Sequence, residues 1–474
     1  MREKLPELKQ LTDAEKDALI VELWEENLRL RVENEMLRAQ VREMEQRLAA
    51  LEAKLNEPPK TSKNSSVPPS QTQKGNQSKG KPKGLRREAS VGRKGGGRQL
   101  DPNPDQIVTA KVKICPHCAA TIAESEQKLT AVYDKIEIPP IKPIVTRVNQ
   151  YGGQCGHCHK DYVAPVPVGM EAGSPFGSSV RSLATYYRYT HAISYERLTQ
   201  MFGNVFGLEI SEGALANLFA SAKGRLDGHV TAILARLRRA RLICSDETSV
   251  RVNGKNQWEW VFQNQEVCLH VIRPSRAAAV IEEVLSNHRP EIWVSDLYSS
   301  QKNHPAEQWQ VCLAHQLRDC QYGIDAADTI FAARMKTVLL RAFVIHKRRE
   351  RLSASTLYQY RCDLNRRLEA ALELKPTNAH GIRLRKRYLE LKENLFLFLE
   401  DASIPPTNNQ SERDLRMSKI FRKVTNGFRS DWGRDLFASV RSIVNTAKRH
   451  GLNAFHAISK ALSSNSPDFL FRPG

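Results

Sequence analysis

Two adjacent acids end a short apolar run in a chain that is otherwise strongly basic. The stretch ICSDETSVRVNG contains Asp246 and Glu247, whereas the whole chain has 72 Lys and Arg against 52 Asp and Glu. ARLICSD indicates a buried strand, which TSVRV continues with alternating apolar and polar residues. Because successive side chains of a strand point to opposite faces, the two acids cannot serve one site, and we expect Glu247 to be structural.

A second acid follows at the end of a later apolar strand. Asn253 and Gly254 predict a tight hairpin turn, and QWEWVFQN and EVCLHVIRP predict two further strands. AAAVIEEVLSNH is typical of a helix, and EIWVSD is a strand ending at Asp296. Three antiparallel strands, a helix and another strand are the opening order of a ribonuclease-H-like fold. In that fold the first acid lies on the first strand and the second at the tip of the fourth, beside it.

The candidate for a third acid lies in IPPTNNQSERDLR. Two prolines followed by Thr407 and Asn408 are a strong signal for the start of a helix, with Glu412 in its first or second turn. Arg416 and Lys419 follow at i+4 and i+7, on the same helical face as Glu412. This face therefore offers a carboxylate to a metal and cations to a DNA backbone. Taken alone, it is equally a solvated helix with an ordinary Glu–Arg pair.

Four cysteines form two CxxC pairs, Cys115 with Cys118 and Cys155 with Cys158. A single CxxC is compatible with a redox pair, but two supply the four thiolates of a closed tetrahedral zinc site. The intervening segment, KLTAVYDKIEIPPIKPIVTRVNQYGGQ, has the composition of strands, so we expect a zinc ribbon with one or two hairpins.

A long helix is predicted from Thr12 to Leu55, because TDAE has the form of a capping box. Apolar residues then occupy two positions of every heptad, except at Asn27 and Asn34. This pattern predicts a coiled coil, in which buried Asn pairs favour two strands, although a single amphipathic helix can mimic it. The two heptad positions are Ile20, Asn27, Asn34, Val41, Leu48 and Leu55, and Leu23, Leu30, Leu37, Met44 and Leu51.

Two further segments differ in composition. Residues 58–100 contain eleven Lys and Arg, one Glu and almost nothing apolar, which predicts a disordered linker that also serves as a basic arm along phosphates. SYERLTQMFGNVFGLEISEGALANLFASAKGRL contains two helical patterns separated by a glycine turn, with Ser211 as a cap. This fits a helix-turn-helix, and plain helical packing fits equally well.

The net charge of +20 points to a polyanionic partner, most readily nucleic acid. No apolar run approaches the roughly 18 residues that a membrane span needs, and the charged N-terminus is unlike a signal peptide. We therefore expect an intracellular chain with no membrane partner, whose nine cysteines serve metal binding or packing rather than disulfides.

The sequence resembles the transposases of the insertion-sequence sixty-six family, which carry a DDE catalytic triad. The resemblance extends over nearly the whole chain, and the most specific motifs are NNQSERDLR and the pair SDET and WVSD. Other matching segments are the leucine-rich N-terminal helix, KTSKNSSVPPSQ, the double CxxC, SYERLTQMFG, ISEGALAN, CLAHQLRD and RSDWGRDLFASVRSIVNTAKRHGLN.

The resemblance implies that Asp246, Asp296 and Glu412 are the catalytic carboxylates. Such a triad suits two Mg²⁺ or Mn²⁺ ions, because hard cations prefer carboxylate oxygens and two metals can stabilise both the attacking and the leaving oxygen of an in-line phosphodiester transfer. His315 and Arg318, in CLAHQLRD, are secondary candidates for contacting DNA or assisting the site, and His315 is equally well explained as a buried structural residue.

We therefore expect a multidomain α+β protein that binds the ends of a bacterial insertion sequence, cleaves the DNA and joins it to a target. The implied partners are DNA, a second copy through the coiled coil, and other small proteins of the element, in the cytoplasm at the nucleoid. The alternatives are a structure-specific nuclease of the same fold and a domesticated, non-catalytic DNA-binding regulator with zinc. The expected divisions are 12–57 coiled coil, 58–100 linker, 101–165 ribbon with one Zn²⁺, 166–240 helical and candidate helix-turn-helix, 241–428 ribonuclease-H-like with a helical insertion at about 325–400, and 429–474 helical.

Overall fold

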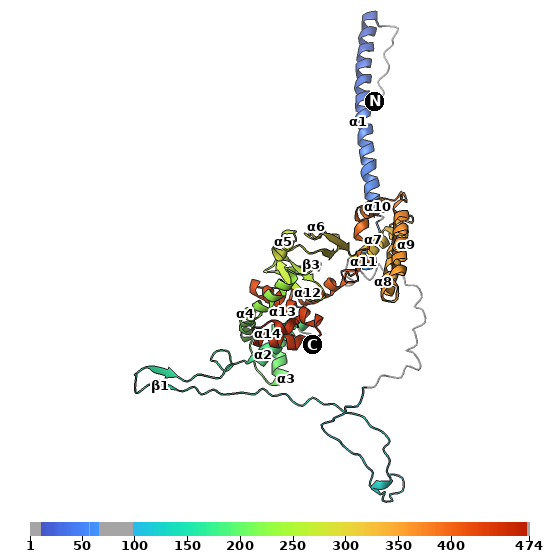
Figure 1. The fold of residues 1–474 in the computed structure, drawn as a ribbon. Helices are drawn as coiled ribbons and strands as arrows, with labels where there is room; N and C mark the ends of the chain where they lie inside the picture. The colour runs from blue at the N-terminus through green and yellow to red at the C-terminus, as the bar shows by residue number, and fades with distance from the viewer. Residues whose placement is uncertain (1–10, 56, 66–97, 472–474) are drawn as a thin grey trace. The chain divides into compact units, whose positions relative to one another are not determined.

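The computed structural model describes residues 11–55, 57–65 and 98–471. The chain divides into two compact units, each assembled from segments far apart in sequence (Figure 1). One unit combines the N-terminal 76 residues with residues 315–392 and is helical where it is described. The other contains residues 77–314 and 393–474 and holds every strand among the described residues. Mixed helices and strands confirm the predicted α+β class.

The helical unit begins with α1, a helix of 43 residues from Asp13 to Leu55. Its start is the predicted capping box: the backbone N–H of Thr12 donates to the Glu15 carboxylate at 2.8 Å, and the Glu15 N–H donates back to the Thr12 hydroxyl at 3.4 Å. Apolar side chains along α1 remain exposed, among them Leu23 at 61% and Leu37 at 52%. The helix therefore forms as predicted but lacks a covering surface within the described part of the chain.

The segment after α1 packs onto the end of α7, Leu313–Asp325, rather than extending freely. Asn64 is buried, and its side-chain amide donates to the Asp325 carboxylate at 2.8 Å. The Thr61 N–H donates to the Asn64 side-chain oxygen at 2.7 Å, which closes a local turn. The rest of the predicted linker, 66–97, lies outside the described residues. The other helices of this region are α7 Leu313–Asp325, α8 Phe331–Arg348, α9 Ala354–Leu372 and α10 Ala379–Leu391, with short 3-10 turns at Arg349–Arg351 and Lys392–Asn394.

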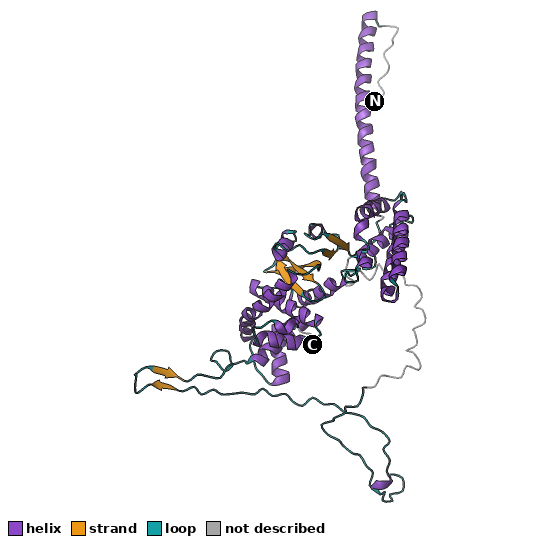
Figure 2. Ribbon diagram, viewed as in Figure 1, coloured by secondary structure: helices purple, strands orange, loops and turns teal. Residues whose placement is uncertain are grey.

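The other unit is organised around a mixed five-stranded sheet (Figure 2). Its order is β5-β4-β3-β6-β7, so the first strand in sequence is central. β3 pairs antiparallel with β4 and parallel with β6, while β4 pairs antiparallel with β5 and β6 parallel with β7. The strands are β3 Leu242–Val252, β4 Lys255–Gln263, β5 Cys268–Arg273, β6 Ile292–Ser295 and β7 Gln308–Val311.

The hairpin between β3 and β4 forms at the predicted residues. Asn253 and Gly254 have φ of 50° and 74°, which matches the left-handed pair that a two-residue hairpin turn requires. Asn and Gly tolerate this conformation better than other residues, so local sequence is enough to place the turn. The turn fixes the pairing of Val252 with Lys255 and hence the register of the whole hairpin.

Helices from both ends of this unit cover the sheet. α12 packs against β3 and β4, and α13 packs against β5 and against α4, so segments 166–240 and 429–474 share one helical layer. Figure 1 shows α12 and α13 on one side of β3, with α5 and α6 on the other. The helices are α2 Ser178–His191, α3 Tyr195–Phe206, α4 Glu212–Leu237, α5 Ala279–Leu285, α6 Ser299–Lys302, α11 Leu397–Glu400, α12 Asn409–Thr425, α13 Asp431–Arg449 and α14 Ala454–Ser463, with a final 3-10 turn at Asp468–Phe471.

The cysteine-containing segment differs from the expectation of strands between its two CxxC pairs. Residues 128–151 contain no strand, and their apolar side chains are exposed, with Ile138 at 83% and Val145 at 91%. Strand-forming side chains need a packed surface opposite them, and this stretch has none among the described residues. Regular pairing is limited to β1 Gly152–Gln154 with β2 Asp161–Val163 and to an isolated bridge between Ile114 and Thr121.

Candidate active site

Asp246 and Asp296 are brought together by the parallel pairing of β3 and β6. The register runs from Leu242 opposite Ile292 to Cys244 opposite Val294. Continued by two residues, it sets Asp296, which directly follows β6, level with Asp246. Side chains at level positions of neighbouring strands point to the same face of a sheet. The two carboxylates, both half-buried, therefore lie side by side at one edge of the sheet.

Backbone N–H groups orient both carboxylates. Oδ1 of Asp246 accepts a hydrogen bond from the N–H of Glu247 at 2.9 Å, and Oδ1 of Asp296 accepts one from the N–H of Tyr298 at 3.0 Å. A hydrogen bond to a backbone donor restricts the rotation of a carboxyl group. Both side chains are therefore held in defined orientations.

Glu247 faces the opposite side of β3, as alternation predicts. It is buried, and its carboxylate accepts hydrogen bonds from Arg276 at 2.8 Å and from Gln301 at 2.7 Å. Burial raises the pKa of Glu247; the hydrogen bond from Gln301 opposes this shift, and the nearby charge of Asp296 adds to it. These contacts join β3 to α6 and to the loop before α5. Glu247 therefore has a structural role.

The helix that carries Glu412 is anchored on the face of Asp246. Asp246 pairs with Val261, so the side chains of these two residues share a face, and Val261 packs against Leu415 of α12. At the start of α12, the Asn408 amide donates to the backbone carbonyl of Ser245 at 2.6 Å. Two further bonds continue along the helix, from Gln263 to Ser411 at 3.0 Å and from Ser418 to Glu259 at 2.8 Å.

Glu412 lies one helical turn after Asn408 on α12 and is half-buried. The predicted helix start is confirmed, because α12 begins at Asn409. The expected cap differs, however: Asn408 occupies the N-cap position without capping, since its side-chain oxygen accepts from the Ser411 hydroxyl while its amide donates to Ser245. Long-range anchoring has replaced the local cap.

The remaining candidates divide between the two units. Arg416 is exposed and Lys419 half-buried, both on the helical face of Glu412. His315 and Arg318 lie on α7, in the helical unit, whereas the three acids belong to the other unit. Sequence reasoning did not single out Arg422 and Lys423, although Lys423 continues the spacing of Glu412, Arg416 and Lys419 at i+11.

Carboxylate oxygens are suitable ligands for a hard divalent cation, but the three acids do not form one cluster of ligands. Among the residues described, no three His, Cys, Asp or Glu side chains are grouped closely enough to hold a metal ion. Mg²⁺ keeps several waters and is commonly bound through one or two carboxylates. The adjacent pair, Asp246 and Asp296, therefore fits such an ion by donor type.

The two CxxC segments have the same local geometry. The N–H of Cys115 donates to the Ala120 carbonyl at 2.8 Å, and the N–H of Cys155 donates to Lys160 at 2.9 Å. Each turn ends on a residue of positive φ, Ala119 at 59° and His159 at 53°. Backbone N–H groups of the residues within each CxxC lower the pKa of Cys115 and Cys155, which favours thiolates. Both segments thus fit metal ligation, although the four cysteines are not gathered into one cluster in the described part of the chain.

None of the described helices combines the length and the apolar character that a membrane crossing requires.

The residues of this candidate site lie in a part of the chain that matches a known family. The profile of the IS66 family of transposases matches residues 173–435, which is more than half of the chain and includes all three acids. The chain belongs to the IS66 transposase family, whose members act on DNA. A family of unknown function (DUF6444) matches residues 3–99, the region of α1 and the basic segment after it. Among curated proteins, no sequence matches this chain.

Proposed function

We propose that this protein is a DDE-type transposase that binds the ends of a bacterial insertion sequence, cleaves the DNA and joins it to a target. The observation that supports this most directly is the register of β3 and β6, which sets Asp246 level with Asp296. We assign these two acids and Glu412 as the catalytic carboxylates. The proposal extends the family membership to a mechanism and to named residues.

The strand order supports a ribonuclease-H-like core. Three antiparallel strands precede a helix and two parallel strands, with the first acid on the central strand and the second at the end of its parallel neighbour. The third acid lies on α12, and the helices α8 to α11, within residues 325–400, are among those that separate it in sequence from Asp296. We interpret these helices as an insertion in the catalytic domain.

The residues of the site would have different roles in a phosphodiester transfer. A divalent cation bound to these carboxylates would supply charge for the attacking and leaving oxygens. Asp246 and Asp296 are oriented by backbone N–H groups, and Asn408 anchors the helix carrying Glu412. Arg416 and Lys419 would bind DNA phosphates beside the scissile bond.

The other parts of the chain would position the DNA. We propose that α1 forms a coiled-coil dimer, because its apolar heptad positions are exposed. The two CxxC segments would bind one structural zinc, and α3 and α4, with the Gly207 turn between them, would contact element ends as a helix-turn-helix. In this arrangement one dimer can hold two DNA ends.

The proposal is tested by Mg²⁺-dependent cleavage of a labelled duplex of the DNA that flanks the gene. We compare three proteins at one low salt concentration: wild type, Asp246→Asn and the control Glu282→Gln. Glu282 is an exposed acid of α5. Salt must be fixed because a chain this basic binds any DNA when screening is weak.

We expect wild type and Glu282→Gln to cleave the duplex. Asp246→Asn should bind DNA but cleave it at least 100-fold more slowly, because the loss of one catalytic group commonly lowers the rate by about this factor. Equal cleavage by Asp246→Asn would refute the assignment of the triad. DNA binding without cleavage by wild type would instead favour a DNA-binding regulator.

A further inference from the structure

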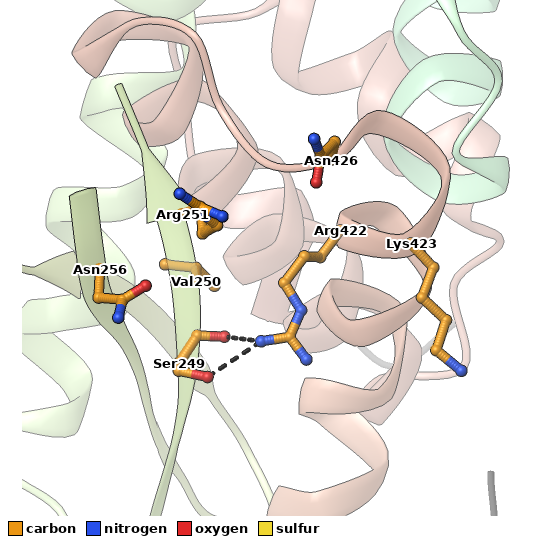
Figure 3. A pocket seen from close by; sticks show the side chains of 7 residues that line it. All are labelled: Ser249, Val250, Arg251, Asn256, Arg422, Lys423 and Asn426. Carbon is orange, nitrogen blue, oxygen red and sulfur yellow. Dashed lines mark hydrogen bonds between the residues drawn. The ribbon is translucent and has the colours of Figure 1, made fainter. Parts of the chain in front are cut away.

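A basic cavity of about 370 Å³ lies where β3 meets the end of α12 (Figure 3). Three of the residues that line it are cationic and two are asparagines, and none of its lining residues is acidic. The lining residues are Ser249, Val250, Arg251, Asn256, Arg422, Lys423 and Asn426. Three positive charges around one cavity repel each other unless an anion lies between them.

The backbone holds the walls of this cavity in place. After α12 the chain crosses β3, where the Phe428 N–H donates to the Arg251 carbonyl at 2.8 Å and the Asn253 N–H donates to the Phe428 carbonyl at 2.9 Å. Gly427 has a φ of +105°, and a Cβ at this position would lie 2.5 Å from the Arg251 carbonyl oxygen. Only glycine permits this approach, so the cavity depends on a tertiary contact specific to this fold.

Arg422 is fixed across the cavity by one of its nitrogens. Its Nη1 donates to the Ser249 carbonyl at 2.6 Å and to the Ser249 hydroxyl at 3.0 Å, as Figure 3 shows. Among the described residues these bonds use Nη1 alone, so Nε and Nη2 still carry N–H groups to donate. A guanidinium oriented in this way can form paired hydrogen bonds to a phosphate. Arg251 and Lys423 are exposed at the rim of the cavity and can add their positive charges around the same phosphate.

A basic stripe connects this cavity to the acidic edge. Along α12, Glu412, Arg416, Lys419 and Lys423 recur at i, i+4, i+7 and i+11, so they share one helical face. The stripe therefore begins at the proposed third carboxylate and ends at the cavity. A phosphate chain that enters the acidic site can follow the stripe as far as the cavity.

The strand gives the separation of the two sites. Ser249 to Arg251 follow Asp246 by three to five residues on β3. At about 3.3 Å per residue this corresponds to roughly 10–17 Å. DNA advances about 3.4 Å per nucleotide along one strand of a duplex, so the cavity lies roughly three to five nucleotides from a bond held at Asp246.

We propose that the cavity binds a backbone phosphate of the DNA, roughly three to five nucleotides from the bond that is cut. The proposal rests on the proposed function for its choice of DNA as the source of the phosphate and for the position of the cut. The cavity thereby acts as a fixed anchor that sets the register of the strand relative to the carboxylates.

The first test compares a cavity variant with a control of equal charge. Arg251→Gln/Lys423→Gln removes two exposed cations at the cavity, and Lys375→Gln/Lys386→Gln removes two exposed cations from the other unit. Affinity for the duplex of flanking DNA is measured against salt concentration. We expect the cavity variant to bind about tenfold more weakly at 0.15 M salt and its log–log salt slope to fall by about 1, as for one lost phosphate contact. Equal effects of both variants would overturn the proposal.

The second test places single methylphosphonate linkages, which are uncharged, along each strand of the same duplex. Wild type should bind most weakly when the neutral linkage lies three to five nucleotides from the cut, and the cavity variant should no longer respond at that position. A response unchanged in the cavity variant would overturn the proposal. Binding of inorganic phosphate by wild type, with an unaltered DNA salt slope in the variant, would assign the cavity to free phosphate and also overturn it.

The two proposals fail in distinguishable ways. Cleavage by wild type together with a cavity variant that behaves like its control would remove the phosphate site and leave the transposase proposal in place. A reduced salt slope in the cavity variant, without cleavage by wild type, would support the phosphate site while contradicting the catalytic proposal.

Discussion

The side-chain amide of Asn408 donates a 2.6 Å hydrogen bond to the backbone carbonyl of Ser245, the residue before Asp246. Its side-chain oxygen accepts from the Ser411 hydroxyl at 2.6 Å, and its own N–H donates to the Cys312 sulfur at 3.1 Å. A single buried residue thus joins β3 and the first turn of α12 through its side chain, and the residue after β7 through its backbone N–H. The position of Glu412 relative to Asp246 depends on this junction.

Asn408→Ala is therefore expected to lower both stability and cleavage. Loss of the hydrogen bonds from Asn408 to the Ser245 carbonyl and from the Ser411 hydroxyl to Asn408 should cost about 1–3 kcal/mol of unfolding free energy, measured in urea. Cleavage per folded molecule should fall by at least tenfold, because catalytic groups displaced by even 1 Å lose much of their effect.

A suitable control is Asn378→Ala, which removes the N-cap of α10 in the helical unit, where Asn378 accepts from the N–H of His380 at 2.8 Å. It should lose about 1 kcal/mol without a change in cleavage by the folded protein. If Asn408→Ala cleaves as fast as this control, the anchoring role is wrong.

His304 predicts a loss of stability in mild acid. Burial lowers the pKa of His304 from 6.5 to about 4, and its ring stacks on Trp293 at a centroid distance of 5.7 Å. Between pH 6.5 and 4 the unfolded chain binds a proton that the folded chain does not, so stability falls as the pH falls. His304→Gln should show a smaller decrease across this window in urea titrations at several pH values. Parallel curves for the two proteins would contradict this explanation.

The CxxC segments predict one zinc ion per chain. Metal analysis of purified protein should find about one equivalent in wild type and a loss in Cys155→Ser, because a closed structural site needs all four ligands. Cys362→Ser, which changes an exposed cysteine of α9, should keep the metal. Full zinc content in Cys155→Ser would show that this cysteine is not a ligand.

The exposed seam of α1 predicts a dimer. Leu30→Lys/Leu37→Lys places charges at two successive positions of the same heptad row, which should convert the dimer to a monomer at micromolar concentration in light scattering after size exclusion. Leu28→Lys/Met36→Lys is the matched control, since these side chains are 50% and 58% exposed but lie outside the seam. A dimer that survives the seam variant, or dissociates equally in the control, would argue against a coiled coil.

Local sequence determined the features that depend on neighbouring residues. The capping box at Thr12, the Asn253–Gly254 turn and the cap at Ser211, which accepts from the Ala214 N–H at 3.2 Å, all form where they were predicted. Each involves partners within three residues of each other, so residue type and spacing suffice. The same reasoning failed for residues 128–151. Their composition is typical of strands, but they form none, because no packed surface lies against them among the described residues.

Only the tertiary structure decided the contacts between distant segments. Residue types identified Asp246, Asp296 and Glu412 as candidates, but their arrangement depends on strand register and on the use of Asn408 across 163 positions of sequence. The basic cavity likewise joins Arg422 to Ser249 over 173 positions, and no local pattern encodes that pairing. Sequence alone thus determined which side chains are candidates for the chemistry, whereas long-range backbone pairing and the close approach at Gly427 decided where they lie.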